Sequence, residues 1–277
     1  MGSTKNLPSS SKGLFPFTQM NHIRLASLLL VLPITLCAVV ADSPGAIAQD
    51  RVVIQARKLV LLRSGEVARD FPERKRAIVR YPIVRGLSDP AVLRRIQNTL
   101  AIKNVFDSSL EEYRQDGWLS EFDYKLNYNK NYLLDITFSQ SGMGAYPDTQ
   151  TKHFLINLKT GRVIKAGDAF NPDSFATLAT MVDQKLKAET KEIIKEVEAD
   201  KDSDADQKSS LKEQLEQLTF TVEDLDEFSV SDKGVTFLYD AGFPHVIQAL
   251  QPDGSYFFSY AELRPYVNRT GPLGVFN

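Results

Sequence analysis

The chain has 277 residues, with 33 basic and 35 acidic side chains and a formal net charge of −2 at pH 7. This balance lacks the excess of positive charge that is typical of nucleic-acid-binding domains, so we expect no nucleic-acid partner. Cys37 is the one cysteine, which excludes internal disulfides and zinc sites built from several cysteines.

The segment before residue 49 has the three parts of a secretory signal. Arg24 precedes an apolar run over residues 25–41, and the small residues Ala46 and Ala48 follow a short polar stretch. A positive residue, an apolar core and an Ala-x-Ala sequence are typical of a cleaved signal peptide. We therefore expect an N-terminal extension and signal peptide over residues 1–48, with Met20 as an alternative start, and a single extracytoplasmic domain over residues 49–277.

An uncleaved membrane anchor is the alternative to a cleaved signal. The apolar run has 17 residues and contains Pro33, whereas a membrane-spanning helix needs about 20 apolar residues. We therefore expect a periplasmic or secreted protein, anchored to the membrane only if the signal segment stays attached. Residues 49–277 contain no cysteine, which suits a bacterial envelope domain that folds on its apolar core.

The first part of this domain combines strand and helix signals. Residues 52–62 and 77–84 are rich in branched apolar residues and are predicted to be strands. Asp89 and Pro90 then predict a helix start, because aspartate caps helices and proline is tolerated in the first turn. Apolar residues at helical spacing predict that this helix continues to Gly117.

The middle of the domain shows the alternation that is typical of half-buried strands. Apolar residues occupy every second position over residues 122–128, 134–138 and 154–158, and polar turns follow the first and the last of these runs. Such period-two alternation indicates an antiparallel meander with one buried face.

The last third returns to helices and then to strands. Asn171 and Pro172 predict the start of a long amphipathic helix, and a capping box from Ser210 to Glu213 predicts a shorter one. Strands around residues 235–239 and 256–258 and a short helix after Ser259 complete the chain. Helices and antiparallel strands thus come in blocks, so we expect an α+β fold with an early helix, a long central helix, a shorter one and a short C-terminal helix.

Charge is distributed unevenly along the domain. Residues 51–85 contain ten basic and three acidic side chains, whereas residues 189–227 contain fourteen acidic and five basic ones. One interpretation is two solvated faces. The other is that the basic N-terminal arm contacts an anionic envelope polymer or lipid head groups.

From Tyr81 onward the order of motifs resembles a known extracytoplasmic domain of unknown function. The resemblance lies in Tyr81-Pro82 before a helix with Asn98, the loop Ser141-Gly-Met-Gly-Ala-Tyr-Pro147, the run Phe154-Leu-Ile-Asn-Leu-Lys-Thr-Gly161 with Asp168-Ala-Phe170, and Leu263-Arg-Pro-Tyr266. This domain is shared by lysozyme-sensing anti-sigma factors of the RsiV type and peptidoglycan deacetylases of the PdaC type. The resemblance implies a sensory or binding role in the bacterial envelope.

The chain departs from this family pattern in three respects. Tyr146 stands where the family loop commonly has a histidine, so that histidine's role does not transfer. The segment before the apolar run is too short for a sigma-binding region, and no remaining segment is long enough for a separate deacetylase domain. We therefore expect the module to stand alone.

Catalytic motifs are not recognisable in the domain. Its histidines, His153 and His245, lack the spacing that positions metal ligands, and no serine lies in a nucleophile motif. Asp202, Asp204, Asp206 and Glu213 match calcium-ligand positions, but Gln207 replaces the turn glycine. We therefore expect no metal and no cofactor, while a pair of carboxylates acting on a glycan stays open.

The loop from Ser141 to Asp148 is the best candidate for recognition, with an ordinary turn between strands as the alternative. Its glycines, Gly142 and Gly144, permit backbone conformations closed to other residues, and we expect Tyr146 to anchor a ligand together with Phe243 of a second loop. The candidate ligand-binding residues are Gly142, Gly144, Tyr146, Pro147, His153, Phe243 and His245.

The sequence therefore predicts a non-catalytic exported module that binds an envelope protein or a cell-wall glycan. The alternatives are an envelope hydrolase with unidentified carboxylates and a purely structural envelope component.

Overall fold

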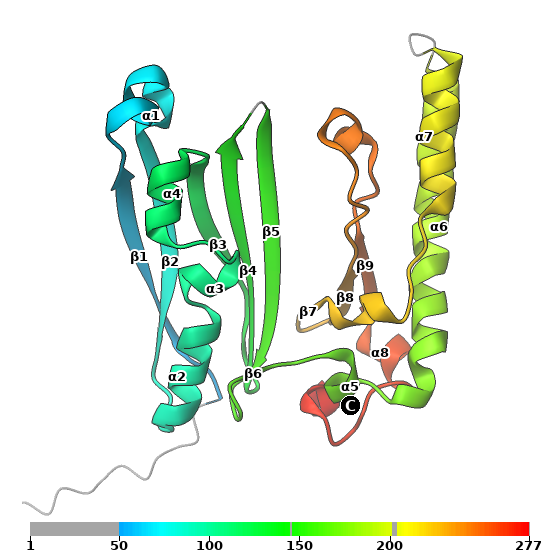
Figure 1. Ribbon diagram of the computed structural model, residues 1–277. Coiled ribbons are helices and arrows are strands. Elements are labelled where there is room, and N and C mark those ends of the chain that lie inside the picture. The colour runs from blue at the N-terminus through cyan, green and yellow to red at the C-terminus, as the bar shows by residue number, and fades with distance from the viewer. Residues whose placement is uncertain (1–49, 145, 201–203, 277) are drawn as a thin grey trace, which may run out of the picture. The chain divides into compact units, whose positions relative to one another are not determined.

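The computed structural model describes residues 50–144, 146–200 and 204–276, all of which lie in one compact unit. The predicted signal segment lies outside these residues. The described chain has an α+β fold with a six-stranded and a three-stranded sheet (Figure 1), which confirms the expected class. In the same residues, no helix combines the length and the apolar character that are needed to span a membrane.

The larger sheet has the strand order β1-β2-β3-β4-β5-β6 and contains the predicted meander. Its strands are β1 (Val53–Leu62), β2 (Arg76–Arg85), β3 (Leu119–Lys130), β4 (Leu133–Met143), β5 (Pro147–Asn157) and β6 (Arg162–Val163). All neighbours are antiparallel except β2 and β3, which are parallel. A parallel pair needs a long crossover connection, which the helices between β2 and β3 provide. The predicted meander of β3, β4 and β5 is antiparallel, and the larger sheet is mixed because of this one parallel pair.

The helical segment before β3 consists of three helices instead of the predicted single one. They are α2 (Pro90–Thr99), α3 (Ile102–Val105) and α4 (Leu110–Asp116). Asp89 caps α2 as predicted, and Gly117, with φ of 70°, ends α4. The break before α4 comes from Asp107, which has a left-handed φ of 53°, and from Ser109, which forms a capping box with Glu112.

These three helices cover one face of the six-stranded sheet (Figure 1). Aromatic rings run across that face, with Phe122 5.8 Å from both Phe106 and Phe138, and Phe154 6.0 Å from Phe138. The buried residues that helices and strands contribute to this core include Val92, Ile96, Leu100, Val105, Tyr113, Val79, Phe122, Ile136 and Phe138. Burial of this apolar face explains the period-two pattern of β3, β4 and β5.

The smaller sheet is antiparallel and packs against the long helix. Its strands are β7 (Phe228–Val230), β8 (Gly234–Leu238) and β9 (Ser255–Ser259), and the helices are α6 (Phe175–Ala199), α7 (Ala205–Gln217) and α8 (Tyr260–Leu263). Ser259 and Glu262 form the capping box of α8, as predicted. The predicted start of α7 at Ser210 was wrong, because Asp204 accepts a hydrogen bond from the Gln207 N–H (2.8 Å) and starts the helix earlier.

Short helical turns connect these elements. They are α1 (Gly65–Asp70), η1 (Pro72–Lys75), α5 (Ala166–Ala169), η2 (Pro172–Ser174), η3 (Glu223–Asp226), η4 (His245–Leu250) and η5 (Pro272–Phe276).

A second core joins the other face of the six-stranded sheet to the smaller sheet. Leu133 and Leu155 of the larger sheet share a buried cluster with Phe170, Phe228 and Phe237. Phe170 lies 5.4 Å from Phe228 and 5.6 Å from Phe237 between ring centroids. The two sheets therefore bury apolar side chains against each other.

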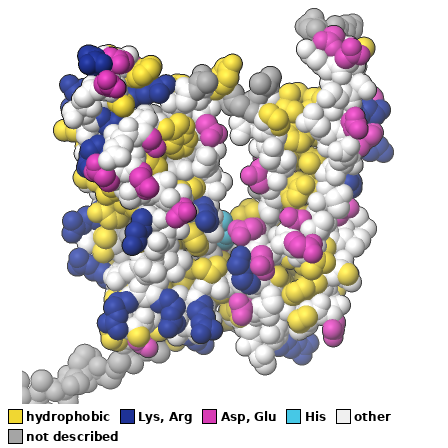
Figure 2. All heavy atoms as spheres, viewed as in Figure 1, with side chains coloured by type: hydrophobic (Ala, Val, Ile, Leu, Met, Phe, Trp, Pro, Cys, Tyr) yellow, Lys and Arg dark blue, Asp and Glu magenta, His cyan; other side chains and the backbone are white. Residues whose placement is uncertain are grey.

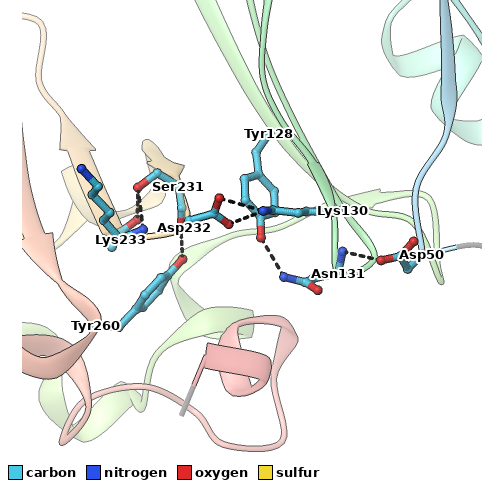
Figure 3. Close-up of polar contacts among 9 residues, drawn as sticks. Asp50, Tyr128, Lys130, Asn131, Ser231, Asp232, Lys233 and Tyr260 are labelled. Carbon is cyan, nitrogen blue, oxygen red and sulfur yellow. Dashed lines mark hydrogen bonds and ion pairs between the residues drawn. The ribbon is translucent and has the colours of Figure 1, made fainter.

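Polar contacts at the strand turns complete this junction (Figure 3). Lys130, at the end of β3, forms an ion pair with Asp232 of the β7–β8 turn (2.6 Å), and the Tyr260 hydroxyl donates to the Ser231 carbonyl (2.9 Å). On the other side, the Asn131 N–H donates to Asp50 (3.3 Å). The β3–β4 turn thus holds the start of the described chain and one end of the smaller sheet.

Tyr113 makes the stability of this fold sensitive to alkaline pH. Burial raises the pKa of its phenol to about 12, and the hydroxyl donates to Gln140 (2.5 Å). Because the folded state favours the protonated phenol, its contribution is complete below about pH 10 and is lost as the pH rises towards 12. We expect this titration to lower the free energy of unfolding by about 2–3 kcal/mol between about pH 10 and pH 12, and Tyr113→Phe to abolish that part of the decrease. Urea unfolding at several pH values measures the effect. An unchanged pH dependence would contradict this assignment.

Candidate functional site

The end of the β4–β5 hairpin carries four of the seven predicted ligand-binding residues. Gly142 lies directly beside Trp118, and a Cβ on this glycine would come within 2.4 Å of the Trp118 carbonyl oxygen and 2.5 Å of its indole ring. The Met143 N–H donates to the same carbonyl (3.0 Å). Neither Gly142 nor Gly144 has a left-handed φ. The two glycines therefore do not use the conformations that other residues avoid, and Gly142 is instead needed for the close approach of the tryptophan.

The turn η1 adds residues to this hairpin end that sequence analysis did not identify. The Arg74 guanidinium donates to the Gly144 carbonyl (3.0 Å) and lies over the Phe71 ring, 4.5 Å from its centroid. A guanidinium over an aromatic face is an attractive cation–π arrangement. Arg74 thus connects the aromatic ring before η1 to the tip of the hairpin.

Together these residues form an exposed apolar surface, which we call the hairpin-tip surface. Its members are Phe71, Arg74, Trp118, Met143 and Tyr146. Tyr146 is 63% exposed, Phe71 45% and Met143 37%. Trp118 is partly buried below them and packs on the helix-covered core. A cluster of exposed large apolar side chains is a candidate contact surface.

Arg63 holds the elements under this surface in place. Its side chain is buried, and it donates to the carbonyl oxygens of Tyr113 (2.8 Å), Arg74 (2.6 Å) and Leu119 (2.7 Å). These carbonyls come from α4, η1 and the first residue of β3. Burial lowers the pKa of this guanidinium, and the Asp116 carboxylate opposes that shift. Because arginine stays charged in proteins, the three carbonyls are held by a cation.

His153 occupies a different environment, at the junction of the two sheets. Its Nε2 atom lies 2.7 Å from Oδ1 of Asp135, which is completely buried. The same carboxylate accepts hydrogen bonds from Asn127 Nδ2 (2.7 Å), Ser229 Oγ (2.8 Å) and the Val230 N–H (2.7 Å). Asp135 therefore has four partners and connects β3, β4 and β5 to β7. This arrangement gives His153 a structural role.

A pocket of about 200 Å³ lies beside His153. Its charged lining residues include Lys152, Lys165, Asp226 and Glu227. Lys165 lies 3.7 Å from Asp226 and 3.4 Å from Glu227, so these three charges pair with one another. The pocket thus combines a histidine that contacts a buried carboxylate with an ion-paired rim.

The second predicted loop does not join the hairpin tip. It connects β8 and β9 of the smaller sheet, whereas the hairpin joins β4 and β5 of the larger one. Phe243 is only 9% exposed and packs with Val197, Leu211 and Leu215 from α6 and α7. It is a core residue because these helices cover it. His245 begins η4, and its side chain lies outside the described part of the structure.

The acidic segment whose spacing matches calcium-ligand positions forms the start of a helix. Asp202 lies outside the described residues, and Asp204 caps α7. In residues 50–144, 146–200 and 204–276, no group of three or more histidine, cysteine, aspartate or glutamate side chains is arranged to hold a metal ion.

Solved structures with the same fold exist, although no protein-family model and no curated protein matches this chain. A member of the DUF3298 family from Bacteroides fragilis NCTC 9343 has 13% sequence identity and a TM-score of 0.53, covering 81% of this chain and 97% of that one. A DUF3298 family protein from Pseudomonas aeruginosa PAO1 has 14% identity and a TM-score of 0.47, covering 78% and 94%. The first similarity shows that the chain shares the fold of a domain of unknown function.

The network around Asp135 predicts a large effect of its removal. Asp135→Ala leaves four donors in a buried site without their acceptor, so we expect unfolding to require about 3–5 kcal/mol less free energy. Urea unfolding measures this loss. Asp173→Ala, in the exposed turn η2, is the matched control and should change stability by less than about 0.5 kcal/mol. A loss below about 1 kcal/mol in Asp135→Ala would contradict the structural role.

Phe243 should affect stability and leave ligand binding unchanged. Phe243→Ala creates a cavity between α6, α7 and the loop, which we expect to lower the free energy of unfolding by about 3 kcal/mol. The matched control is Phe257→Ala, because Phe257 is 44% exposed on β9. If Phe243→Ala weakened binding while the melting temperature stayed unchanged, the core assignment would be wrong.

Proposed function

We propose that this protein is a non-catalytic binding module of the bacterial envelope, with a protein or a cell-wall polysaccharide as its ligand. The observation that carries the proposal is the hairpin-tip surface, where exposed aromatic and apolar side chains stand at the end of a sheet. The extracytoplasmic location is supported by the charge and apolar pattern of residues 1–48.

The composition of the hairpin-tip surface supports a binding role. Tryptophan, tyrosine and arginine are the residues that most often dominate binding energy at interfaces. Trp118, Tyr146 and Arg74 bring all three types together, with Phe71 beside them. Aromatic rings offer a large contact area at a small entropic cost, and their polar atoms accept or donate hydrogen bonds at the rim.

The rigidity of this surface supports the same function. The hairpin strands β4 and β5 pair along their full length, from Leu133 opposite Asn157 to Met143 opposite Pro147. Arg63 fixes the neighbouring elements through buried hydrogen bonds. A surface that is ordered before binding loses less conformational entropy when the ligand arrives.

The pocket beside His153 does not favour a hydrolase. Asp135 is occupied by four hydrogen-bond partners, and Asp226 and Glu227 are paired with Lys165. A general acid and a nucleophile must both reach the substrate. The observed contacts nominate no such pair of carboxylates, so we assign no catalytic residue.

Tyr146 provides the direct test of the proposal. We expect the purified protein to bind peptidoglycan fragments or lysozyme saturably without cleaving the glycan, and Tyr146→Ala to weaken that binding about tenfold, or about 1.4 kcal/mol. Isothermal titration gives the affinity, and chromatography of the fragments reveals any cleavage. The melting temperature should stay unchanged, because Tyr146 is mostly exposed.

Phe257→Ala serves as the control for loss of an exposed aromatic ring outside this surface, and it should bind like the unaltered protein. Unchanged affinity in Tyr146→Ala would place the binding site elsewhere. Cleavage of the fragments would overturn the non-catalytic proposal in favour of a hydrolase.

A further inference from the structure

Strand β1 forms one edge of the six-stranded sheet (Figure 1). All ten of its residues pair with β2, from Val53 opposite Arg85 to Leu62 opposite Arg76, without a register shift. On its other side, no strand of the described chain lies next to it. A long edge without a bulge or a proline is a template for pairing with another extended chain.

The backbone groups that such a partner would meet follow from the ladder. The Arg63 N–H donates to the carbonyl of Lys75, so Arg63 and every second residue before it hydrogen-bond to β2. The residues between them direct their N–H and C=O groups to the open edge. These outward-facing residues are Ile54, Ala56, Lys58, Val60 and Leu62.

The side chains of β1 are unusually exposed for a strand. Eight of the ten are exposed, so both faces of the strand meet solvent over most of its length. The apolar ones are Val53 (53% exposed), Leu59 (37%), Val60 (45%) and Leu62 (58%). An added strand would bury apolar side chains here as well as satisfy backbone groups.

The charge around this edge is positive and largely uncompensated. Figure 2 shows Lys and Arg side chains gathered along the β1–β2 side of the larger sheet. Arg80 forms ion pairs with Glu121 (2.5 Å) and Asp123 (2.7 Å). In the described part of the chain, Arg57 and Lys58 have no acidic partner. An approaching acidic segment would therefore be attracted, and more so at low salt.

We propose that the edge of β1 binds an extended, acidic segment of a partner protein, which adds as a seventh strand to this sheet. This interaction surface is separate from the hairpin-tip surface and does not depend on the function proposed above. A second copy of the chain fits the edge less well. Antiparallel pairing of two β1 strands about their outward-facing centre places Lys58 of one copy opposite Lys58 of the other, and like charges directly opposite each other destabilise a strand pair.

Two synthetic peptides test the proposal with the full chain. Both have about ten residues with valine at every second position; glutamate fills the other positions in the first peptide and lysine in the second. We expect the acidic peptide to bind at least about tenfold more tightly by fluorescence anisotropy, and its affinity to fall as salt is added. In amide exchange, the acidic peptide should protect Ala56, Lys58 and Val60. Equal affinity for both peptides, or no binding, would overturn the proposal.

Two variants, each with a control, separate the contribution of backbone hydrogen bonds to peptide affinity from the contribution of charge. Val60→Pro removes an outward N–H that β2 does not use, so binding should be lost while the melting temperature changes little; Val60→Ala keeps that N–H and should bind. The double substitution Arg57→Glu with Lys58→Glu should reverse the preference to the lysine peptide. Arg94→Glu, on the exposed side of α2, is the matched charge control and should bind like the unaltered protein.

Three results would reject this assignment. The first is that Val60→Pro binds the acidic peptide normally. The second is that the β1 amides are already protected before any peptide is added, which would mean that another part of the chain pairs with β1. The third is a dimer in sedimentation equilibrium that Val60→Pro dissociates, which would make a second copy the natural occupant.

Discussion

The buried carboxylate of Asp135 constrains how the two sheets meet. It projects from β4 of the larger sheet and accepts hydrogen bonds from Ser229 and Val230 of the smaller one. A buried charge without partners is strongly unfavourable, so these hydrogen bonds favour an arrangement in which β7 lies next to β4. The same requirement positions Asn127 and His153 beside the carboxylate. The hydrogen bonds of Asp135 thus favour one register for the apolar contacts of the second core that surround it.

Arg63 applies the same physical principle at the end of the larger sheet where the hairpin tip lies. A buried guanidinium needs acceptors, and it finds them in the carbonyls of α4, η1 and β3. The consequence differs from that of Asp135, because these carbonyls lie next to residues that reach solvent. The carbonyl in η1 belongs to Arg74, which is itself part of the hairpin-tip surface. The carbonyl in β3 belongs to Leu119, which directly follows Trp118 of the same surface. A buried charge thus orders an exposed surface, and a surface that is ordered in advance loses less conformational entropy on binding.

The two binding surfaces that we propose on the larger sheet would use different parts of the polypeptide for recognition. The hairpin-tip surface presents side chains, mostly aromatic, that stand on a fully paired hairpin. The edge of β1 presents backbone groups, with side chains that add charge and apolar area. Side-chain recognition discriminates by shape, whereas strand addition selects an extended conformation and, through Arg57 and Lys58, its charge. Taken together, the two proposals describe a module that holds a ligand and a partner protein through separate surfaces.

The sequence by itself determined the local elements and the fold class. Alternation predicted β3, β4 and β5, and the caps at Asp89 and Ser259 predicted where helices begin, because these signals act between residues that are close along the chain. Tertiary structure decided which polar residues are buried. Asp135 and His153 lie on the polar side of their strands, where alternation predicts solvent, yet the smaller sheet covers them. Phe243 and Tyr146 are both loop aromatics in sequence, but α6 and α7 bury one and the hairpin exposes the other. Burial depends on elements that are distant in sequence, and periodicity within one strand or loop carries no information about them.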